Sequence, residues 1–395
     1  MKSKSIYIFL VLIILGSGCV KLDYENPNGP TDTQVLTSRE GLLTLSIGMK
    51  QYYSTTGLQA LLINPGVTSR ELRGITTFTN VLELEAGGTA LPTFNGNVLA
   101  LWSSMLRTMG MADDLLNNAD EVLATDNATR TGVIAFASLF KAMAISGLST
   151  GFEQFPVQTD EDGAATFVTR QAALEAAIAL LNNAVTSLAA TPPSAEFNTR
   201  VAGTDLVLID CINAYRARIN MMLGKYAESL TAANAVNLTS KSQFVYNSQS
   251  PNPVYQQSTV AANYKPRSNF GLPSALVEAG DARLNFYLGT PDIPVGGETL
   301  KTLKGFFDDI TKPIPVYLPD EVKLLKAEAI LRSSGPLADA VTQINLVRTQ
   351  SSGDPFNVYA NLPAYSGAVT RDALLVEVYR QRSAELFLQG LRLED

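Results

Sequence analysis

The sequence predicts a mostly α-helical domain made of antiparallel helix pairs that carry one large irregular insertion. Residues 206–236 hold two amphipathic segments separated by a glycine, and residues 318–348 repeat that arrangement. Residues 238–316, between the two pairs, are rich in proline and aromatic residues and show little helical period. We therefore expect a single domain whose helical platform spans residues 39–237 and 317–395, with the insertion at 238–316.

Composition excludes several classes of function. The 395 residues are 46% hydrophobic and 17% charged, which are values typical of globular proteins. The formal net charge is −7 and no basic run is present, so we expect no nucleic-acid partner. The chain has no histidine, which removes the commonest general base and the commonest metal ligand. We expect no cofactor and no metal site; enzymes without histidine exist, but the absence of histidine makes a catalytic function less expected.

The N-terminal segment is typical of a secreted, lipid-anchored protein. Two lysines precede the apolar run Ile6 to Leu15, which is too short to span a bilayer, and small residues lead directly to Cys19. This resembles a bacterial lipoprotein signal, with residues 1–18 as signal peptide, Cys19 as the acylated residue and 19–38 as a tether. An ordinary cleaved signal with an incidental cysteine is the alternative. Beyond the anchor we expect a soluble protein, in which Cys211 is a small buried side chain.

Helical periodicity is clear in most of the first half of the chain. Capping residues before an apolar stripe predict a helix at about 39–54. Periodicity then fails over residues 64–97, a length that suggests a functional loop or a packed irregular one. Three further helices are expected, at about 97–124, 128–147 and 170–189, of which the second is nearly all apolar and should be central.

The two helix pairs resemble the tetratricopeptide pattern in outline. Small residues at Ala217 and Ser229 allow the first two helices to approach closely, and Ala340 holds the corresponding position in the second pair. A tandem solenoid would keep a period of about 34 residues. Because Ser229 and Ala340 are much farther apart in the sequence, the pairs belong to a fixed platform rather than to a regular array.

The insertion contains the stretch Tyr264 to Gly271, which interleaves aromatic, cationic and amide side chains. Such a composition suits stacking on, and hydrogen bonding to, a polar ligand with flat apolar faces. The alternative is that these aromatic residues only hold a large insertion on the helices.

The C-terminal stretch Tyr379 to Asp395 resembles the terminal motif of the SusD/RagB outer-membrane lipoproteins of Bacteroidetes, E-R-x-x-E-L-x-x-E-G-x-R-x-x-D. Glutamines replace two acids of the motif, and Asp281-Ala282-Arg283 stands where the family often has Asp-Pro-Arg. Family members usually continue past this motif, so we expect a C-terminally truncated chain. The residues that match the motif include Arg382, Glu385, Gly390, Arg392 and Asp395. We interpret the motif as an ion network that holds the fold, in which Arg382 pairs with Glu385 three residues away and Arg392 pairs with Asp395 or with a helix terminus, while Gly390 suits a helix end.

The resemblance implies a SusD-like platform and a surface-exposed outer-membrane lipoprotein without catalytic activity. It implies partnership with a SusC-like TonB-dependent barrel transporter, to which captured glycans, or in some members peptides, are delivered. The family's ligand site lies on loops from the first irregular segment and from the insertion. In this chain the corresponding candidates are Arg70, Arg73, Phe78, Asn80, Tyr264, Asn269 and Phe270.

Two other functions remain open from the sequence. One is a lipid-anchored, tetratricopeptide-like scaffold that binds envelope proteins through its helix pairs. The other is a carboxylate-dependent glycosidase, for which the candidate catalytic acids are Asp113-Asp114 and Asp308-Asp309. Acids adjacent in sequence do not supply the separated pair that glycoside hydrolysis requires, so this alternative is the weaker one.

Overall fold

The computed structural model describes residues 32–159 and 163–395, and the predicted lipidation site Cys19 lies outside these residues. The helices are α2 (Asp32–Leu36), α3 (Arg39–Tyr52), α4 (Leu58–Thr68), α5 (Thr79–Ala86), α6 (Gly96–Val122), α7 (Asn127–Ser149), α8 (Arg170–Ala190), α9 (Ala195–Phe197), α10 (Leu208–Met222), α11 (Tyr226–Asn234), α12 (Pro253–Tyr255), α13 (Ala282–Tyr287), α14 (Pro319–Arg332), α15 (Leu337–Arg348) and α16 (Arg371–Glu385). The strands are β1 (Leu72–Gly74), β2 (Gln154–Pro156), β3 (Phe167–Thr169), β4 (Gln243–Phe244), β5 (Tyr264–Pro266), β6 (Leu288–Val295), β7 (Glu298–Leu303) and β8 (Ile314–Pro315). They pair two by two, as β1–β5, β2–β3, β4–β8 and β6–β7, all antiparallel.

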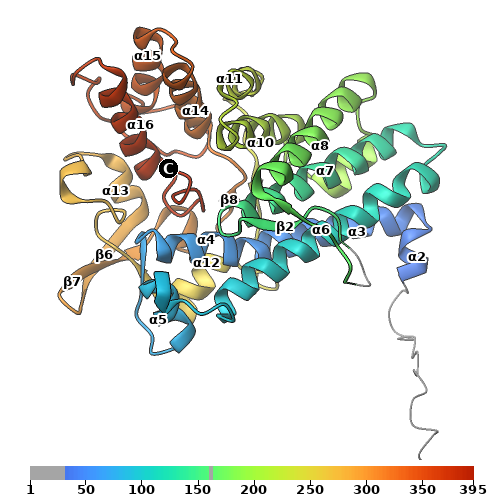
Figure 1. Ribbon diagram of the computed structural model, residues 1–395, viewed down its shortest axis with the longest axis horizontal. Coiled ribbons are helices and arrows are strands. Elements are labelled where there is room, and N and C mark those ends of the chain that lie inside the picture. The colour runs from blue at the N-terminus through green and yellow to red at the C-terminus, as the bar shows by residue number, and fades with distance from the viewer. Residues whose placement is uncertain (1–31, 160–162) are drawn as a thin grey trace, which may run out of the picture.

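The predicted helical platform is present. Helices α3, α6, α7, α8 and α10 pack as one body, and α14, α15 and α16 form a second group beside it (Figure 1). Helix α7 is the centre of the core, because nearly all of its residues from Gly132 to Ser149 are buried. Its neighbours α6 and α8 cover it with apolar stripes, as their 3.6-residue periodicity predicts. Helix α8 ends immediately before Thr191-Pro192-Pro193, where proline cannot continue a helix.

Helices α7 and α8 are long and apolar enough to cross a membrane by length and composition alone. In α7, 89% of the apolar window is buried inside the fold, which is the arrangement of a core helix. In α8 only 28% is buried, and its packing stripe consists mainly of alanine and leucine.

The N-terminal part of the domain is more helical than predicted. Helix α3 starts at the expected position, where the Ser38 side chain accepts a hydrogen bond from the backbone N–H of Gly41. It continues through one π-helical turn (Tyr53–Gly57) into α4. The segment 64–97, expected to be irregular, contains the end of α4, strand β1 and helix α5. Short amphipathic elements of this kind fall below the length at which periodicity is readable.

A short helix, α2, lies in the last part of the predicted tether. It packs against the first turn of α3, where a Cβ atom at Gly41 would lie 2.0 Å from the carbonyl oxygen of Val35. The absence of a side chain at Gly41 therefore permits the two helices to meet backbone against backbone.

Both predicted helix pairs form, as α10–α11 and α14–α15, and α11 packs on α14 so that the pairs are stacked. Gly224 lies in the turn between α10 and α11 and has a φ of +70°, a conformation that favours glycine. Between α10 and α11 the hydroxyl of Ser229 donates a 2.8 Å hydrogen bond to the carbonyl of Ala217. Both residues are fully buried, as expected for small residues at a close helix crossing.

Replacing Ser229 with leucine is expected to lower the free energy of unfolding by about 1–3 kcal/mol, because the larger side chain has no space between α10 and α11. Ser229→Ala is the control: it removes only the hydroxyl and is expected to cost about 1 kcal/mol. Urea denaturation followed by far-UV circular dichroism measures both. Equal stability of the two variants would contradict the close packing of this crossing.

The insertion is ordered and contains short strands and helices rather than only loops. The β6–β7 hairpin projects from the edge of the molecule with α13 beside it (Figure 1). Strand β4, at the start of the insertion, pairs with β8 at its end, so the insertion closes on itself where it leaves the platform. Strand β5, within the insertion, pairs with β1, which belongs to the first half of the chain.

Candidate functional site

The β1–β5 pairing brings together the two segments from which a ligand site was expected. Leu72 lies opposite Pro266 and Gly74 opposite Tyr264, although these residues are far apart in sequence. Beyond β5, Arg267 forms an antiparallel bridge with Leu300 of β7. The chain from β1 through β5 to the β6–β7 hairpin is therefore a continuous surface at one edge of the molecule.

An open groove lies along this surface, with a volume of about 450 Å³. We call it the β1–β5 groove, and it is large enough for one or two sugar rings. Its rim consists mainly of polar side chains. The residues that line it are Arg70, Arg267, Ser268, Asn269, Gly271, Leu272, Pro273, Glu298 and Thr299.

Unusual backbone conformations form the floor of the groove. Arg70 has φ of +69°, Phe270 +57° and Gly271 +72°. A Cβ atom at Gly271 would lie 2.4 Å from the carbonyl oxygen of Arg70, so only glycine allows the two backbones to approach. Non-glycine residues in this region are strained, and such residues cluster at functional sites.

The buried side chain of Arg267 connects the segments that form the groove. Its side chain is 9% exposed; Nε lies 2.8 Å from a Glu298 oxygen and Nη2 lies 2.9 Å from a Glu85 oxygen. Its Nη1 group donates to the backbone carbonyls of Arg70 and Leu72. One guanidinium thus fastens β1, β5, β7 and α5, and its donors are directed at protein atoms rather than at a ligand.

Arg70 contrasts with this buried arginine. Its side chain is 61% exposed, and its guanidinium lies 3.9 Å from the Glu298 carboxylate, too far for a hydrogen bond. Arg73 is more enclosed, because it donates to the carbonyl of Val295 at 2.8 Å and lies 3.4 Å from Glu298. Arg70 is therefore the arginine of the groove that presents its donors to solvent.

Exposed apolar side chains occur just before and within α5 and the first turn of α6; the two helices contact each other, and α5 contacts β1. Asparagines join these two helices: the Asn95 amide donates to the Asn80 carbonyl at 2.9 Å, and the Asn97 amide donates to the same carbonyl at 3.0 Å. Large exposed apolar groups on one surface are typical of binding sites. We call this the α5–α6 apolar surface; it consists of Phe78, Leu82, Phe94 and Leu99, whose residues are 57%, 48%, 82% and 57% exposed.

The structure places the seven predicted site residues in four different environments. Arg70 and Asn269 line the groove, and Arg73 is beside it. Phe78 is exposed on the apolar surface. Asn80 serves a structural role, since its carbonyl and its amide are bound to Asn95 and Asn97.

The prediction was wrong for Tyr264 and Phe270, which are 3% and 2% exposed. The Phe270 ring packs against Tyr287 and Phe387, with centroid distances of 6.2 and 5.1 Å. Burial raises the pKa of the Tyr264 phenol to about 12. The alternative interpretation, that aromatic residues of this stretch hold the insertion on the helices, is correct for these two rings.

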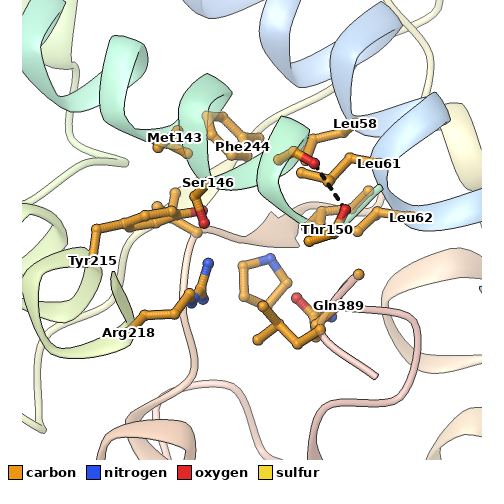
Figure 2. Close-up of a pocket in the computed structure, with 16 residues that line it drawn as sticks. Leu58, Leu61, Leu62, Met143, Ser146, Thr150, Tyr215, Arg218, Phe244 and Gln389 are labelled. Carbon is orange, nitrogen blue, oxygen red and sulfur yellow. Dashed lines mark hydrogen bonds between the residues drawn. The ribbon is translucent and has the colours of Figure 1, made fainter. Parts of the chain in front are cut away.

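A second pocket lies between α4, α7, α10 and the C-terminal segment (Figure 2). Its volume of about 30 Å³ is sufficient for about two water molecules and too small for a sugar ring. Arg218 borders it, is held by Glu321 through two hydrogen bonds of 2.7 Å, and stacks on the Tyr215 ring at 4.3 Å. This pocket is an interior packing feature, and the candidate site is the β1–β5 groove.

The acids considered for glycoside hydrolysis have local structural partners. Asp113 on α6 is paired with Lys141 and accepts hydrogen bonds from Thr159. Asp309 accepts hydrogen bonds from the backbone and hydroxyl of Thr311, and these bonds lower its pKa. None of these residues lines the groove, so its geometry gives the glycosidase hypothesis no support.

No protein-family model and no curated protein matches this sequence. Solved structures do match over nearly the full length. A SusD superfamily protein from Bacteroides fragilis superposes with a TM-score of 0.68 at 14% identity, over 91% of this chain and 89% of the other. A SusD-like carbohydrate binding protein from Bacteroides vulgatus gives 0.68 at 14% identity, over 90% and 82%. A SusD/RagB family protein from Bacteroides thetaiotaomicron gives 0.65 at 16%, over 89% and 85%.

The chain has a SusD-like fold. The fold class expected from the terminal motif is therefore confirmed. Sequence identity this low establishes the architecture only, and the ligand has to be argued from the residues of the groove.

The terminal motif has a structural role in this SusD-like fold, but the expected pairing of Arg382 with Glu385 is wrong. Glu385 does not pair with Arg382; it lies 3.2 Å from Arg283, which is completely buried. Arg382 instead lies 2.5 Å from Asp395. The two segments that resemble the family, at 281–283 and at 379–395, thus meet in the core.

Gly390 and Arg392 attach the end of the SusD-like chain to its N-terminal half. Gly390 has φ of +73°, and a Cβ atom there would lie 2.6 Å from the carbonyl oxygen of Leu61. Arg392 donates to the carbonyl of Ser383 at 2.7 Å, near the end of α16, and lies 3.5 Å from Glu71. The expected contact with a helix terminus is present, whereas the ion-pair partner is Glu71 rather than Asp395.

Sequence reasoning missed several residues of the groove. Arg267 belongs to the stretch that was singled out, and its position two residues from Asn269 was the available signal. Ser268 belongs to the same stretch and is adjacent to Asn269, whereas Glu298 and Thr299 carried no signal, because nothing in the sequence places β7 beside β5. The exposure of Leu82, Phe94 and Leu99 could not be read either, since apolar residues in short helices are usually buried.

Proposed function

We propose that this protein is a surface-exposed, lipid-anchored binding protein of the outer membrane that captures glycans or other nutrient oligomers. It delivers them to a SusC-like, TonB-dependent barrel transporter. The β1–β5 groove is the binding site, the adjoining α5–α6 apolar surface extends it, and Cys19 carries the lipid.

The observation that carries this proposal is the pairing of β1 with β5, which joins two loop segments into one polar groove. Hydroxyl, amide and guanidinium groups bind sugar hydroxyls, and the rings of Phe78 and Phe94 offer faces for stacking. Several proteins of this fold are described as carbohydrate or sugar binding, which supports a glycan ligand here. None of these groups requires a metal or a histidine.

Filling the groove tests the proposal. Ser268→Trp places a large ring at an exposed position of the groove and is expected to weaken the binding of any captured glycan about tenfold or more. Ser352→Trp introduces the same ring at an exposed position outside the groove and should leave binding unchanged. Isothermal titration calorimetry on full-length protein in detergent, with plant, host and microbial glycans, measures the effect.

Two results would count against the proposal. Full-length protein that binds no glycan and no peptide of a broad panel would remove the ligand-binding function. Glycan binding that survives Ser268→Trp would place the site elsewhere on the molecule.

A further inference from the structure

We propose that the β1–β5 groove selects an anionic oligosaccharide and that Arg70 contacts its acidic group. This inference rests on the proposed function and adds the chemical class of the ligand. It comes from the charge balance, the conformation and the lining of the groove.

The charges of the groove do not cancel. Three arginines, Arg70, Arg73 and Arg267, face two carboxylates, Glu85 and Glu298. Glu85 is bound by Arg267 and by the backbone N–H of Gly74, and Glu298 is bound by Arg267 and Arg73. One positive charge is left over, in a chain whose formal net charge is −7. The excess falls on Arg70, the exposed member of the group.

Arg70 is held in place by its backbone rather than by its side chain. Its N–H donates to the carbonyl of Val67 at 3.1 Å, and its own carbonyl accepts from Arg267 at 3.2 Å. Gly271 packs against the same carbonyl. The backbone of Arg70 is therefore fixed, while its guanidinium donors are exposed to water. A planar guanidinium can bind a carboxylate or sulfate group through two parallel hydrogen bonds.

The other lining residues favour a sugar over a peptide. Ser268, in the turn after β5, and Thr299, on β7, carry exposed hydroxyls suited to sugar hydroxyl groups. Leu272 and Pro273 are the apolar side chains of the lining, and no aromatic ring belongs to it. A peptide site would need apolar pockets for side chains, whereas the rings of Phe78 and Phe94, which are proposed to stack on sugar, lie outside this lining. Charge and hydrogen bonding are what this groove offers.

The test compares matched ligands on full-length protein in detergent. Oligogalacturonate supplies carboxylates, chondroitin sulfate oligosaccharides supply sulfates, and carboxyl-reduced oligogalacturonate is the neutral control. We expect at least one acidic ligand to bind about tenfold or more tightly than the neutral one, with affinity that falls as salt rises. Which acidic ligand binds distinguishes carboxylate from sulfate recognition.

Variants assign the acidic contact to Arg70. Arg70→Gln is expected to weaken binding of the acidic ligand about tenfold or more and to remove most of its salt dependence. Arg70→Lys keeps the charge without the paired donors and should fall in between. Arg130→Gln, on α7 and away from the groove, is the control with unchanged affinity. Thermal melting of each variant verifies folding.

The outcomes separate this inference from the proposed function. Equal affinity for acidic and neutral oligosaccharides, or an Arg70→Gln variant that binds as tightly as the natural protein, overturns the anionic selectivity and leaves glycan capture intact. Binding of oligoglutamate with no binding of any oligosaccharide overturns the glycan assignment itself.

Discussion

Replacing Arg283 with methionine is expected to lower the free energy of unfolding by about 3–5 kcal/mol, the cost of removing one partner of a buried ion pair. Arg283 is completely buried and lies 2.7 Å from Asp281 and 3.2 Å from Glu385. It also donates at 2.6 Å to the side-chain carbonyl of Gln381. Methionine fills the volume but leaves two carboxylates without their counter-charge in the core.

The loss should depend on pH. Burial raises the pKa of the Glu385 carboxyl well above its ordinary range, although Arg283 lowers it. Without Arg283 the pKa rises further, and a protonated acid costs less to bury than a charged one. The Arg283→Met defect is therefore expected to be larger at pH 8 than at pH 5.

Guanidinium denaturation at both pH values measures this effect. Lys312→Met is the control, because Lys312 pairs with Asp308 at 3.6 Å on the surface, with about half its side chain exposed. Exposed pairs contribute about 0–1 kcal/mol. A defect in Arg283→Met no larger than that of the control would show that the network does not hold the fold.

Replacing Glu71 with glutamine is expected to stabilise the protein at pH 8. Glu71 is 1% exposed, and burial raises the pKa of its carboxyl from 4.5 to about 7, although Arg392 and the N–H of Leu388 lower it. Near pH 8 the folded protein therefore holds a buried charge at a cost. Glutamine keeps an oxygen that can accept from Leu388 and Arg392, and it carries no charge.

The direction of the pH dependence follows from proton linkage. Between pH 4.5 and about 7 the folded state keeps the Glu71 proton while the unfolded state has lost it. The unfolded state thus binds fewer protons, so the stability of the natural protein falls as pH rises through this window. A difference of about 2.5 in pKa corresponds to a loss of about 3 kcal/mol of stability. This loss has not begun below pH 4.5 and is complete above pH 7.

The measurement is the difference in unfolding free energy between Glu71→Gln and the natural protein at pH 4.5, 6 and 8. Other buried acids, such as Asp320 with its pKa raised to about 6, titrate in both proteins and cancel in the difference. Glu121→Gln, at an exposed position on α6, should keep the pH profile of the natural protein. A difference that stays constant across this range would contradict the assignment to Glu71.

The sequence by itself determined the long helices, the two helix pairs and the likeness to SusD proteins. Helical periodicity is a local property: hydrogen bonds connect residues four apart, and the buried face recurs every 3.6 residues. Helix α15, for example, forms the second half of the pair predicted at 318–348, because its apolar stripe and the preceding turn are both readable in the sequence. The terminal motif is also local, since its residues lie within one short stretch of chain.

Only the tertiary structure decided which of the candidate residues line the groove and which are buried. Tyr264 and Phe270 lie in a stretch whose composition is typical of sugar binding, but both are buried. Phe94 was not predicted as a site residue and is 82% exposed. Arg267 and Arg70 look alike in sequence, yet one fastens four elements and the other points to solvent. The physical reason is that side chains in short strands alternate between two faces, and which face is buried depends on the partner strand. Here β1 and β5 are partners from distant parts of the chain, and no local pattern encodes their pairing.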